Sequence, residues 1–328
     1  DNEYTFSYAN YKKRLNREIL FHRNAVTQSN RYYLEKIHSN EVFYILTWPF
    51  NENLSLHGIA HLRSNMFVQT ATDPVSLNTP TRFENWLGFT TSLVYDGTKR
   101  LGLNLYTGSR WKVFVEYNQL LNKRNHNLFV TGFDYRYYYR IYRKFILAAR
   151  LAGSSSGGTD RLIYFMGGVD NWLNPKYNKT TPVDPNQHYA YRALAVNMRG
   201  FSQNIRNGNS FLLLNTELRM PLFQMFSETP ISSKMLRNFQ VVTFADVGTA
   251  WTGRTPYSKG NMLFTGTVNS GPIHAVVQTQ KDPIVEGFGF GFRLSIFGYF
   301  LRTDIAWGVQ DGVVTPKPIW YWSFNLDF

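Results

Sequence analysis

Arg199 is the residue whose type and position best suit the chemistry of a buried ion pair. It precedes a glycine in the sequence NMRGF (residues 197–201), which ends a long polar segment. A guanidinium stays charged at physiological pH and donates several hydrogen bonds in a planar fork that matches a carboxylate. If the segment folds back into a polar interior, Arg199 can therefore bind an acid there.

The stretch that follows Arg199 reads as a strand with one apolar face and one largely polar face. Side chains in a strand alternate at period two, so residues two apart share a face. From Phe211 to Phe223, one face carries Leu212, Leu214, Thr216, Leu218 and Met220, and the other carries Leu213, Asn215, Glu217 and Arg219. Glu217 and Arg219 are thus candidates for the same polar interior.

Other chemically active groups are weak as catalytic or metal sites. The sequence GSSSG (residues 153–157) fits G-x-S-x-G, but we expect a serine-rich turn there and not a strand-to-helix elbow. His57 and His61 can share a strand face, yet no carboxylate lies between them and the chain has no cysteine, so ordinary histidines are favoured over a metal site. Glycines 287, 289 and 291 stand at alternate positions, where they make room for packing rather than cradle a phosphate. We expect no catalytic residue, no metal and no cofactor.

The composition indicates how such an interior could be built. The 328 residues include no cysteine, 43% are hydrophobic, and the mean hydropathy is -0.32. No stretch approaches the roughly 20 apolar residues of a transmembrane helix. The 21 Tyr, 26 Phe and 8 Trp nevertheless exceed what a soluble core requires. Many aromatic residues in alternating segments are typical of a transmembrane barrel, because only every second residue meets lipid.

The formal charge of +13 admits three interpretations. Nucleic-acid binding needs basic residues gathered on one face, whereas these are spread along the strands and turns. A barrel with a charged interior and basic rims distributes them in this way. A soluble basic surface remains the alternative, and no nucleic-acid partner is expected.

The alternation predicts nine strands before the long polar segment and five after it. The nine cover residues 4–8, 16–26, 42–50, 54–69, 87–95, 101–107, 111–118, 129–140 and 145–153, and the five cover 211–223, 239–249, 284–296, 299–308 and 319–328. Residues 162–209 form an ordered, functional long loop in this interpretation, and residues 251–283 form a second polar loop. Because lipid offers no hydrogen bonds to the backbone, such strands must close on themselves. The predicted fold class is an all-β, transmembrane antiparallel β-barrel.

Four sequence features, taken together, resemble the carboxyl-terminal barrel of the Omp85 superfamily (bacterial surface antigen family). The family's sixth extracellular loop carries a (V/I)-R-G-(F/Y) motif, which Met198-Arg199-Gly200-Phe201 resembles with Met at the branched position. Two further family motifs are E-x-R-x-P, which resembles Glu217-Leu218-Arg219-Met220-Pro221, and D-x-G, which resembles Ala245-Asp246-Val247-Gly248. The family's closing strands and carboxyl-terminal aromatic signal resemble Gly287 to Arg293 with Phe328. They occur in the family's order and cover Phe165 to Phe328. The sequence around Trp172 and Tyr191 is most similar to members with a periplasmic β-propeller ahead of the barrel.

The resemblance implies a structural arrangement for these residues. It implies a barrel of sixteen strands over residues 1–328, against the fourteen that the alternation predicts, with loop 162–209 folded into the lumen. Arg199 would bind Asp246, near Gly248, and Glu217 and Arg219 would extend that network. The terminal signal strand would comprise Trp322, Phe324, Leu326 and Phe328. A signal peptide and an upstream periplasmic domain would be absent from these residues. The alternative is that the lumen charges only satisfy one another.

The resemblance also implies a function. The chain would lie in the outer membrane of a Gram-negative-type bacterium, among outer-membrane lipids and lipopolysaccharide. It would assist the insertion or translocation of other outer-membrane or surface proteins, with periplasmic or lipoprotein accessory subunits as partners. The family's transport step is attributed to a weak seam between the first and last strands, where a client strand pairs. The alternatives are a passive porin or channel and an outer-membrane hydrolase such as a phospholipase.

Overall fold

The structure, a computed structural model, describes most of the chain as two compact units. Described are residues 3–29, 34–70, 77–78, 80–122, 125–184, 189–227, 231–258, 261–270, 273–278, 281–324 and 326–328. The amino-terminal unit comprises Asp1–Tyr95, Lys112–Thr131 and Gly157–Asp160, and the carboxyl-terminal unit comprises Asp96–Trp111, Gly132–Ser156 and Arg161–Phe328. Each is considered by itself below.

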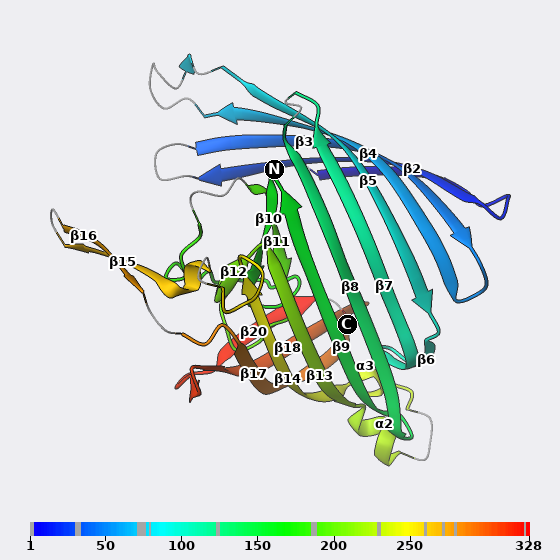
Figure 1. Ribbon diagram of the computed structural model, residues 1–328. Coiled ribbons are helices and arrows are strands. Elements are labelled where there is room, and N and C mark those ends of the chain that lie inside the picture. Colours follow the sequence, from blue (N-terminus) through cyan, green and yellow to red (C-terminus); the bar gives the residue numbers. More distant parts are fainter. Residues whose placement is uncertain are drawn as a thin grey trace. The chain divides into compact units, whose positions relative to one another are not determined.

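Antiparallel strands dominate the described residues (Figure 1). They form a 15-stranded sheet in the order β1-β2-β3-β4-β5-β7-β8-β9-β13-β14-β17-β18-β19, with β6 paired to β7 and β20 paired to β18. The strands are β1 (Glu3–Asn10), β2 (Asn16–Ser29), β3 (Leu34–Pro49), β4 (Leu54–Gln69), β5 (Arg82–Asp96), β6 (Lys99–Gly102), β7 (Leu105–Leu120), β8 (Asn127–Tyr142), β9 (Phe145–Gly158), β13 (Ser210–Met220), β14 (Gln240–Trp251), β17 (Val285–Ile296), β18 (Tyr299–Gln310), β19 (Val313–Val314) and β20 (Ile319–Phe324). The prediction of an all-β antiparallel fold is confirmed. The strand number lies between the fourteen of the alternation and the sixteen of the resemblance.

Alternation was a good guide to strands but a poorer one to their ends. Nine strands precede the long loop in the described residues, as predicted. The predicted strand 101–107 is wrong, because a turn with Asn104 at φ 62° divides it between β6 and β7. The serine-rich turn predicted at residues 153–157 is also wrong, because β9 continues through these residues to Gly158. β3 begins eight residues before the predicted position, in a stretch whose polar side chains hid the pattern.

The amino-terminal unit contains β1 to β5 and parts of β7 and β8. Each strand is joined to the next in register, for example Pro49 with Ser55 across β3 and β4. On β4, His57 contacts the hydroxyls of Thr47 (3.2 Å) and Ser55 (2.9 Å). No cluster of three or more possible metal ligands occurs among the residues that the structure describes.

In the carboxyl-terminal unit, the two faces of the sheet differ sharply. We call them the apolar face, whose side chains are exposed, and the polar face, whose side chains are buried. The apolar face carries Leu212, Leu214, Phe288, Phe290, Phe292, Trp320, Trp322 and Phe324, each at least 38% exposed. The polar face carries Asn215, Glu217, Arg219, Asp246, Arg293, Arg302 and Asp304, each at most 1% exposed. This is the reverse of a soluble domain, in which charged residues are almost never fully buried.

The long loop has secondary structure of its own. β10 (Arg161–Met166) pairs in parallel with β11 (Tyr189–Ala195) and antiparallel with β12 (Arg206–Gly208). Alternation could not reveal β10, because its residues from Leu162 to Met166 are all buried, so both faces are alike. The second polar loop contains the 3-10 helix η1 (Met262–Phe264) and the hairpin β15 (Thr265–Ser270) and β16 (Ile273–Gln278).

Two short helices, α2 (Leu222–Phe226) and α3 (Lys234–Asn238), connect β13 to β14. None of the helices in the described ranges is long and apolar enough to cross a membrane.

Candidate functional site

Residues 198–201 contain Arg199, and we call them the loop tip. Backbone contacts hold this segment in shape. Gly168 and Met198 exchange two backbone hydrogen bonds of 3.0 Å, which bring the two ends of the loop together. Gly200 has a φ of 94°, a left-handed conformation that residues with a Cβ avoid. The glycine beside Arg199 therefore turns the chain and aims the guanidinium at the sheet.

Arg199 binds two acids on two adjacent strands. Its Nε and Nη2 donate to the two carboxylate oxygens of Asp246 on β14, each at 2.7 Å, and its backbone N–H donates to the same carboxylate at 3.1 Å. Its Nη1 donates to Oε1 of Glu217 on β13 at 2.7 Å. The guanidinium also lies over the Phe244 ring, 3.6 Å from the centroid. The side chains of Arg199, Glu217 and Asp246 are all 0% exposed, so water does not share these bonds.

Neighbours on the sheet extend the network from both acids. Asn215 donates to Asp246 Oδ1 (2.7 Å) and to the carbonyl of Asn197 (2.5 Å), so it links β13 to the loop backbone. Arg219 donates from Nε to Oε2 of Glu217 at 2.8 Å. Its Nη2 donates to the carbonyl of Phe328 at 2.9 Å.

A second group of ions continues the network across β17 and β18. Arg293 donates from Nη1 to Asp304 Oδ1 (2.6 Å) and from Nε to Asp327 Oδ2 (2.7 Å). Arg302 lies 2.9 Å from Asp327 Oδ1 and 3.5 Å from Asp304 Oδ2. Asn104 fixes Asp327 through two hydrogen bonds, of 2.7 Å to the carboxylate and 2.9 Å from the backbone N–H. Four guanidiniums and four carboxylates, all buried, therefore alternate through the carboxyl-terminal unit.

Two glycines on the sheet allow the loop tip to approach the backbone. A Cβ at Gly287 of β17 would overlap the carbonyl oxygen of Arg199, and one at Gly308 of β18 would lie 2.5 Å from the Phe201 ring. At Gly200 a Cβ would lie 2.6 Å from the Trp307 carbonyl. The motif therefore rests directly on the backbone of β17 and β18. Gly248, the glycine of the D-x-G sequence, is less crowded: a Cβ there would lie 3.0 Å from Leu213 and Met166 side-chain atoms.

The loop also contacts β20, the last strand. The Gly200 N–H donates to the Tyr321 hydroxyl (2.9 Å), which in turn donates to the carbonyl of Phe201 (2.8 Å). Nearer the start of the loop, Leu173 N–H donates to the carbonyl of Trp322 at 2.9 Å. The Trp172 ring packs on Tyr321, with centroids 4.7 Å apart. The strand β20 thus contacts the loop near its start, at Leu173, and near its end, at Gly200 and Phe201.

Tyr321→Phe is expected to loosen the loop tip without disturbing the sheet. The substitution leaves the buried Gly200 N–H without its acceptor, and the Phe201 carbonyl keeps only the bond from the Gly168 N–H. We expect a cost of about 1–3 kcal/mol in the free energy of unfolding. Chemical unfolding of the full chain in lipid measures that cost. Tyr299→Phe removes a hydroxyl from a side chain that is 67% exposed and serves as the matched control. Equal unfolding free energies for the two variants would contradict the assigned role of Tyr321.

The structure brings together residues of three of the sequence motifs. The fourth motif, at the carboxyl terminus, lies differently from the prediction. Arg199, Glu217, Arg219 and Asp246 lie in one network. The predicted terminal strand is wrong beyond Phe324, where β20 ends. Trp322 and Phe324 lie on the apolar face and Leu326 is half-buried, but Phe328 is only 6% exposed. Its ring lies under Arg219, 5.0 Å from the guanidinium carbon. Asp327 accounts for the change, since its ion pairs draw the chain into the polar side.

Sequence reasoning missed three members of the network. Asn104 lies in a turn, Tyr321 lies on β20 and Asp327 lies beyond the end of β20, and at such places a single residue carries no pattern. A signal did exist for Arg293, Arg302 and Asp304, because all three occupy polar-face positions of neighbouring strands. Such residues must find partners in the interior, and the strand register then determines which ones.

Arg206 forms a separate tether at the base of the loop. Its Nη2 and Nε donate to the carbonyls of Asp282 (2.6 Å) and Pro283 (3.2 Å), just before β17. Burial lowers the pKa of Arg206 to about 10, and the charges of Asp311 and Asp282 only partly offset that effect. Arg206 therefore binds backbone carbonyl groups, whereas Arg199 binds side-chain carboxylates.

Ser155, the serine at the centre of G-x-S-x-G, does not lie in an elbow. It is an exposed residue within β9, and its hydroxyl shares a hydrogen bond of 2.8 Å with Ser210 on β13. Its neighbour Ser154 bonds to the Tyr164 hydroxyl at 2.7 Å. The geometry of these serines is that of cross-strand pairing.

The sequence matches no family model and no curated protein. Among solved structures, the chain is similar to the crystal structure of BamA from Haemophilus ducreyi lacking POTRA domains 1–3, with a TM-score of 0.58, 11% identity, and coverage of 98% of this chain and 60% of that chain. It is also similar to CdiB from Acinetobacter baumannii, with a TM-score of 0.52, 12% identity, and coverage of 99% of this chain and 50% of that chain. The chain thus spans about half to three-fifths of the length of these proteins. At such identities the likeness concerns the fold.

Proposed function

We propose, from the premise that this chain has the fold of the Omp85-superfamily barrels, that it assists the insertion or translocation of other outer-membrane or surface proteins. The long loop would fill the lumen and would be anchored there by Arg199. The observation that carries the proposal is the fully buried contact of Arg199 with Asp246 and Glu217. Those residues come from the separate sequence motifs that the resemblance singled out.

The two faces of the sheet support a place in the outer membrane. Exposed aromatic residues on alternate positions suit lipid, and a polar face with paired charges suits a lumen. Lipopolysaccharide and outer-membrane lipids would then surround the apolar face. Client proteins and accessory subunits of the periplasm would be its protein partners.

The contact between the loop and β20 suggests how anchoring serves transport. A client strand would add to the sheet at an edge, through backbone hydrogen bonds. Tyr321 and Trp322 of β20 are bonded to the loop, so the position of this strand depends on where the loop lies. In our proposal the anchored loop sets the geometry of β20 and, with it, the readiness of the sheet to accept a strand.

Client folding in liposomes tests this function. Liposomes that contain the full-length protein are expected to fold a urea-denatured outer-membrane barrel several times faster than empty liposomes, as followed by the mobility shift of the folded client on gels. Arg199→Met is expected to reduce that acceleration to near the empty-liposome rate, although the protein still inserts.

Two other outcomes would favour the alternatives. A steady ion conductance with no effect on client folding would favour a passive channel. Hydrolysis of the liposome lipid that disappears in Ser155→Ala would favour a hydrolase.

A further inference from the structure

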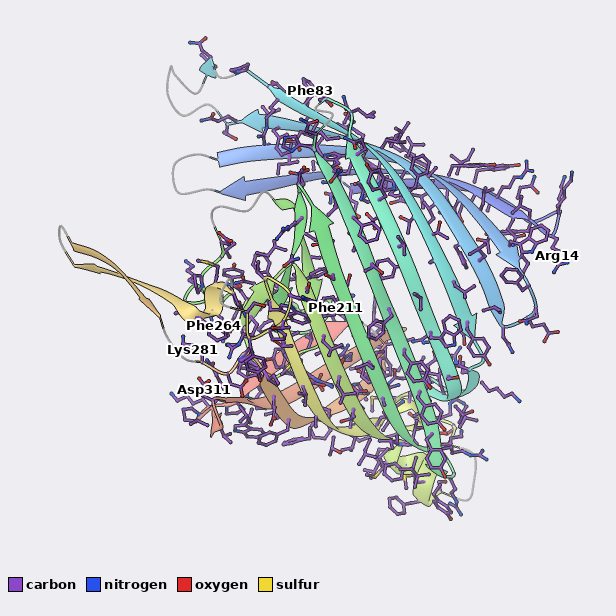
Figure 2. The ribbon with its side chains drawn as sticks, in the orientation of Figure 1. Arg14, Phe83, Phe211, Phe264, Lys281 and Asp311 are labelled. Carbon is purple, nitrogen blue, oxygen red and sulfur yellow. The ribbon has the colours of Figure 1, made fainter. Side chains whose placement is uncertain are left out.

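The segment between β13 and β14 forms an exposed apolar surface at the end of the unit opposite the long loop. Its opposite placement follows from the register, since Ser210 pairs with Ser155 at one end of β13 and Arg219 pairs with Ile146 at the other. Four apolar side chains of α2 and α3 are exposed, and Figure 2 shows side chains of this segment projecting away from the strands. They are Phe223 (40%), Phe226 (75%), Met235 (47%) and Leu236 (38%).

Basic side chains border this surface. Lys234 and Arg237 stand in α3 next to the exposed Met235 and Leu236. From the turn between β8 and β9, the Arg143 Nη1 donates to the carbonyl of Met225 (2.7 Å). Lys144 donates from Nζ to Gln224 at 2.5 Å. By sequence, residues 222–238 contain a single acid, Glu228, so the surface is basic as well as apolar.

An aromatic path joins this surface to the apolar face of the sheet. Phe223 packs on Phe239 with ring centroids 5.6 Å apart, and Phe239 stacks on Phe292 of β17 at 6.1 Å. Phe292 then contacts Phe290 at 6.1 Å, farther along the same face. The apolar side of the helices is thus continuous with the face that we propose to contact lipid.

We infer that α2 and α3, with the Arg143–Lys144 turn, form an interfacial anchor that binds the headgroup layer of a membrane with anionic phospholipids. Aromatic and aliphatic side chains on one side and basic residues on the other are the pattern of segments that lie in the membrane interface. Guanidinium and ammonium groups bind lipid phosphates through charge-assisted hydrogen bonds. The anchor would fix the depth of β13 and β14, the strands that hold the acids of Arg199. This inference rests on the proposed membrane location but not on any client.

Single-cysteine labelling tests the anchor cleanly, because the chain has no cysteine of its own. The full chain is placed in phosphatidylcholine nanodiscs with an environment-sensitive fluorophore at Phe226→Cys. Trace nitroxide-labelled lipid, either phosphatidylglycerol or phosphatidylcholine, then quenches any label that touches the membrane. We expect strong quenching at Phe226→Cys, stronger with phosphatidylglycerol. A label at Tyr257→Cys, an exposed residue of the second polar loop, should not be quenched.

The charged part of the inference has its own variant. Lys234→Gln with Arg237→Gln is expected to lower the preference for phosphatidylglycerol by about 25-fold, at about 5-fold for each basic residue. The matched control, Lys176→Gln with Arg254→Gln, removes two exposed charges from the loops and should leave that preference unchanged.

A label at Leu214→Cys, in the middle of β13 on the apolar face, separates the two levels of failure. If that label is quenched but the one at Phe226→Cys is not, the anchor is refuted while the membrane location stands. If Leu214→Cys is not quenched, the membrane location fails, and the anchor fails with it. Equal quenching of Phe226→Cys by the two lipids would refute the anionic preference.

Discussion

Arg199→Met is expected to release the tip of the long loop and to lower the free energy of unfolding by about 3–5 kcal/mol. The arginine is fully buried and binds Asp246 and Glu217, both equally buried. Removing one partner of a buried ion pair leaves the other charge uncompensated, which costs more than the pair itself contributes. Chemical unfolding in lipid measures the loss of stability, and limited proteolysis measures the exposure of residues 162–209.

The size of this effect can be traced to the stranded acids. Neutralising them in the triple variant Arg199→Met, Asp246→Asn, Glu217→Gln should restore part of the stability, because the uncompensated charges are gone. Arg254→Met removes an exposed arginine from a different loop and controls for the loss of positive charge. If Arg199→Met unfolds like Arg254→Met and its loop resists protease equally, the loop is not anchored by this residue.

Gly287→Ala is expected to displace the loop tip by filling the space that it occupies. The added methyl group would overlap the carbonyl oxygen of Arg199, which is backbone and cannot move aside as a flexible side chain can. Overfilling a packed interior costs about 1–3 kcal/mol. We expect a loss of stability in that range together with protease sensitivity of the loop, although every ion of the network is still present.

Gly58→Ala on β4 is the matched control for this substitution. It also adds a methyl group to a strand glycine, but no atom lies within 4 Å of the new position. Its effect on stability should be small and its loop should stay protected. A Gly287→Ala protein with a protected loop and unchanged stability would mean that the loop tip does not lie on β17 as described.

The amount of the fold that could be predicted from sequence depends on how each residue is surrounded. In β13, one face meets the buried network and the other is exposed, so the alternation from Leu212 to Met220 was plain. In β10 both faces are buried and the pattern vanishes. α2 and α3 have five residues each, too few to show a helical period.

The candidate site was predictable where a residue belonged to a motif. The pairing of Arg199 with Asp246 was expected from the resemblance alone, since no spacing rule links residues so far apart in the sequence. Asp327 lies beyond the end of the final strand, and its partners Arg293 and Asn104 emerge only from the tertiary structure. Register and turns decide such contacts, and neither is written in the local sequence.

The equal numbers of acids and bases in the buried network have a consequence for how the protein responds to ionic strength. Arg199, Arg219, Arg293 and Arg302 balance Glu217, Asp246, Asp304 and Asp327, so the excess of +13 resides elsewhere in the chain. Mobile ions screen exposed charges over about 8 Å at physiological concentration but hardly reach buried ones. Changing the salt concentration should therefore alter the attraction of charged ligands to the exposed surface, while the ion pairs that hold the loop keep their strength. The exposed charges therefore respond to the salt concentration, and the buried network does so hardly at all.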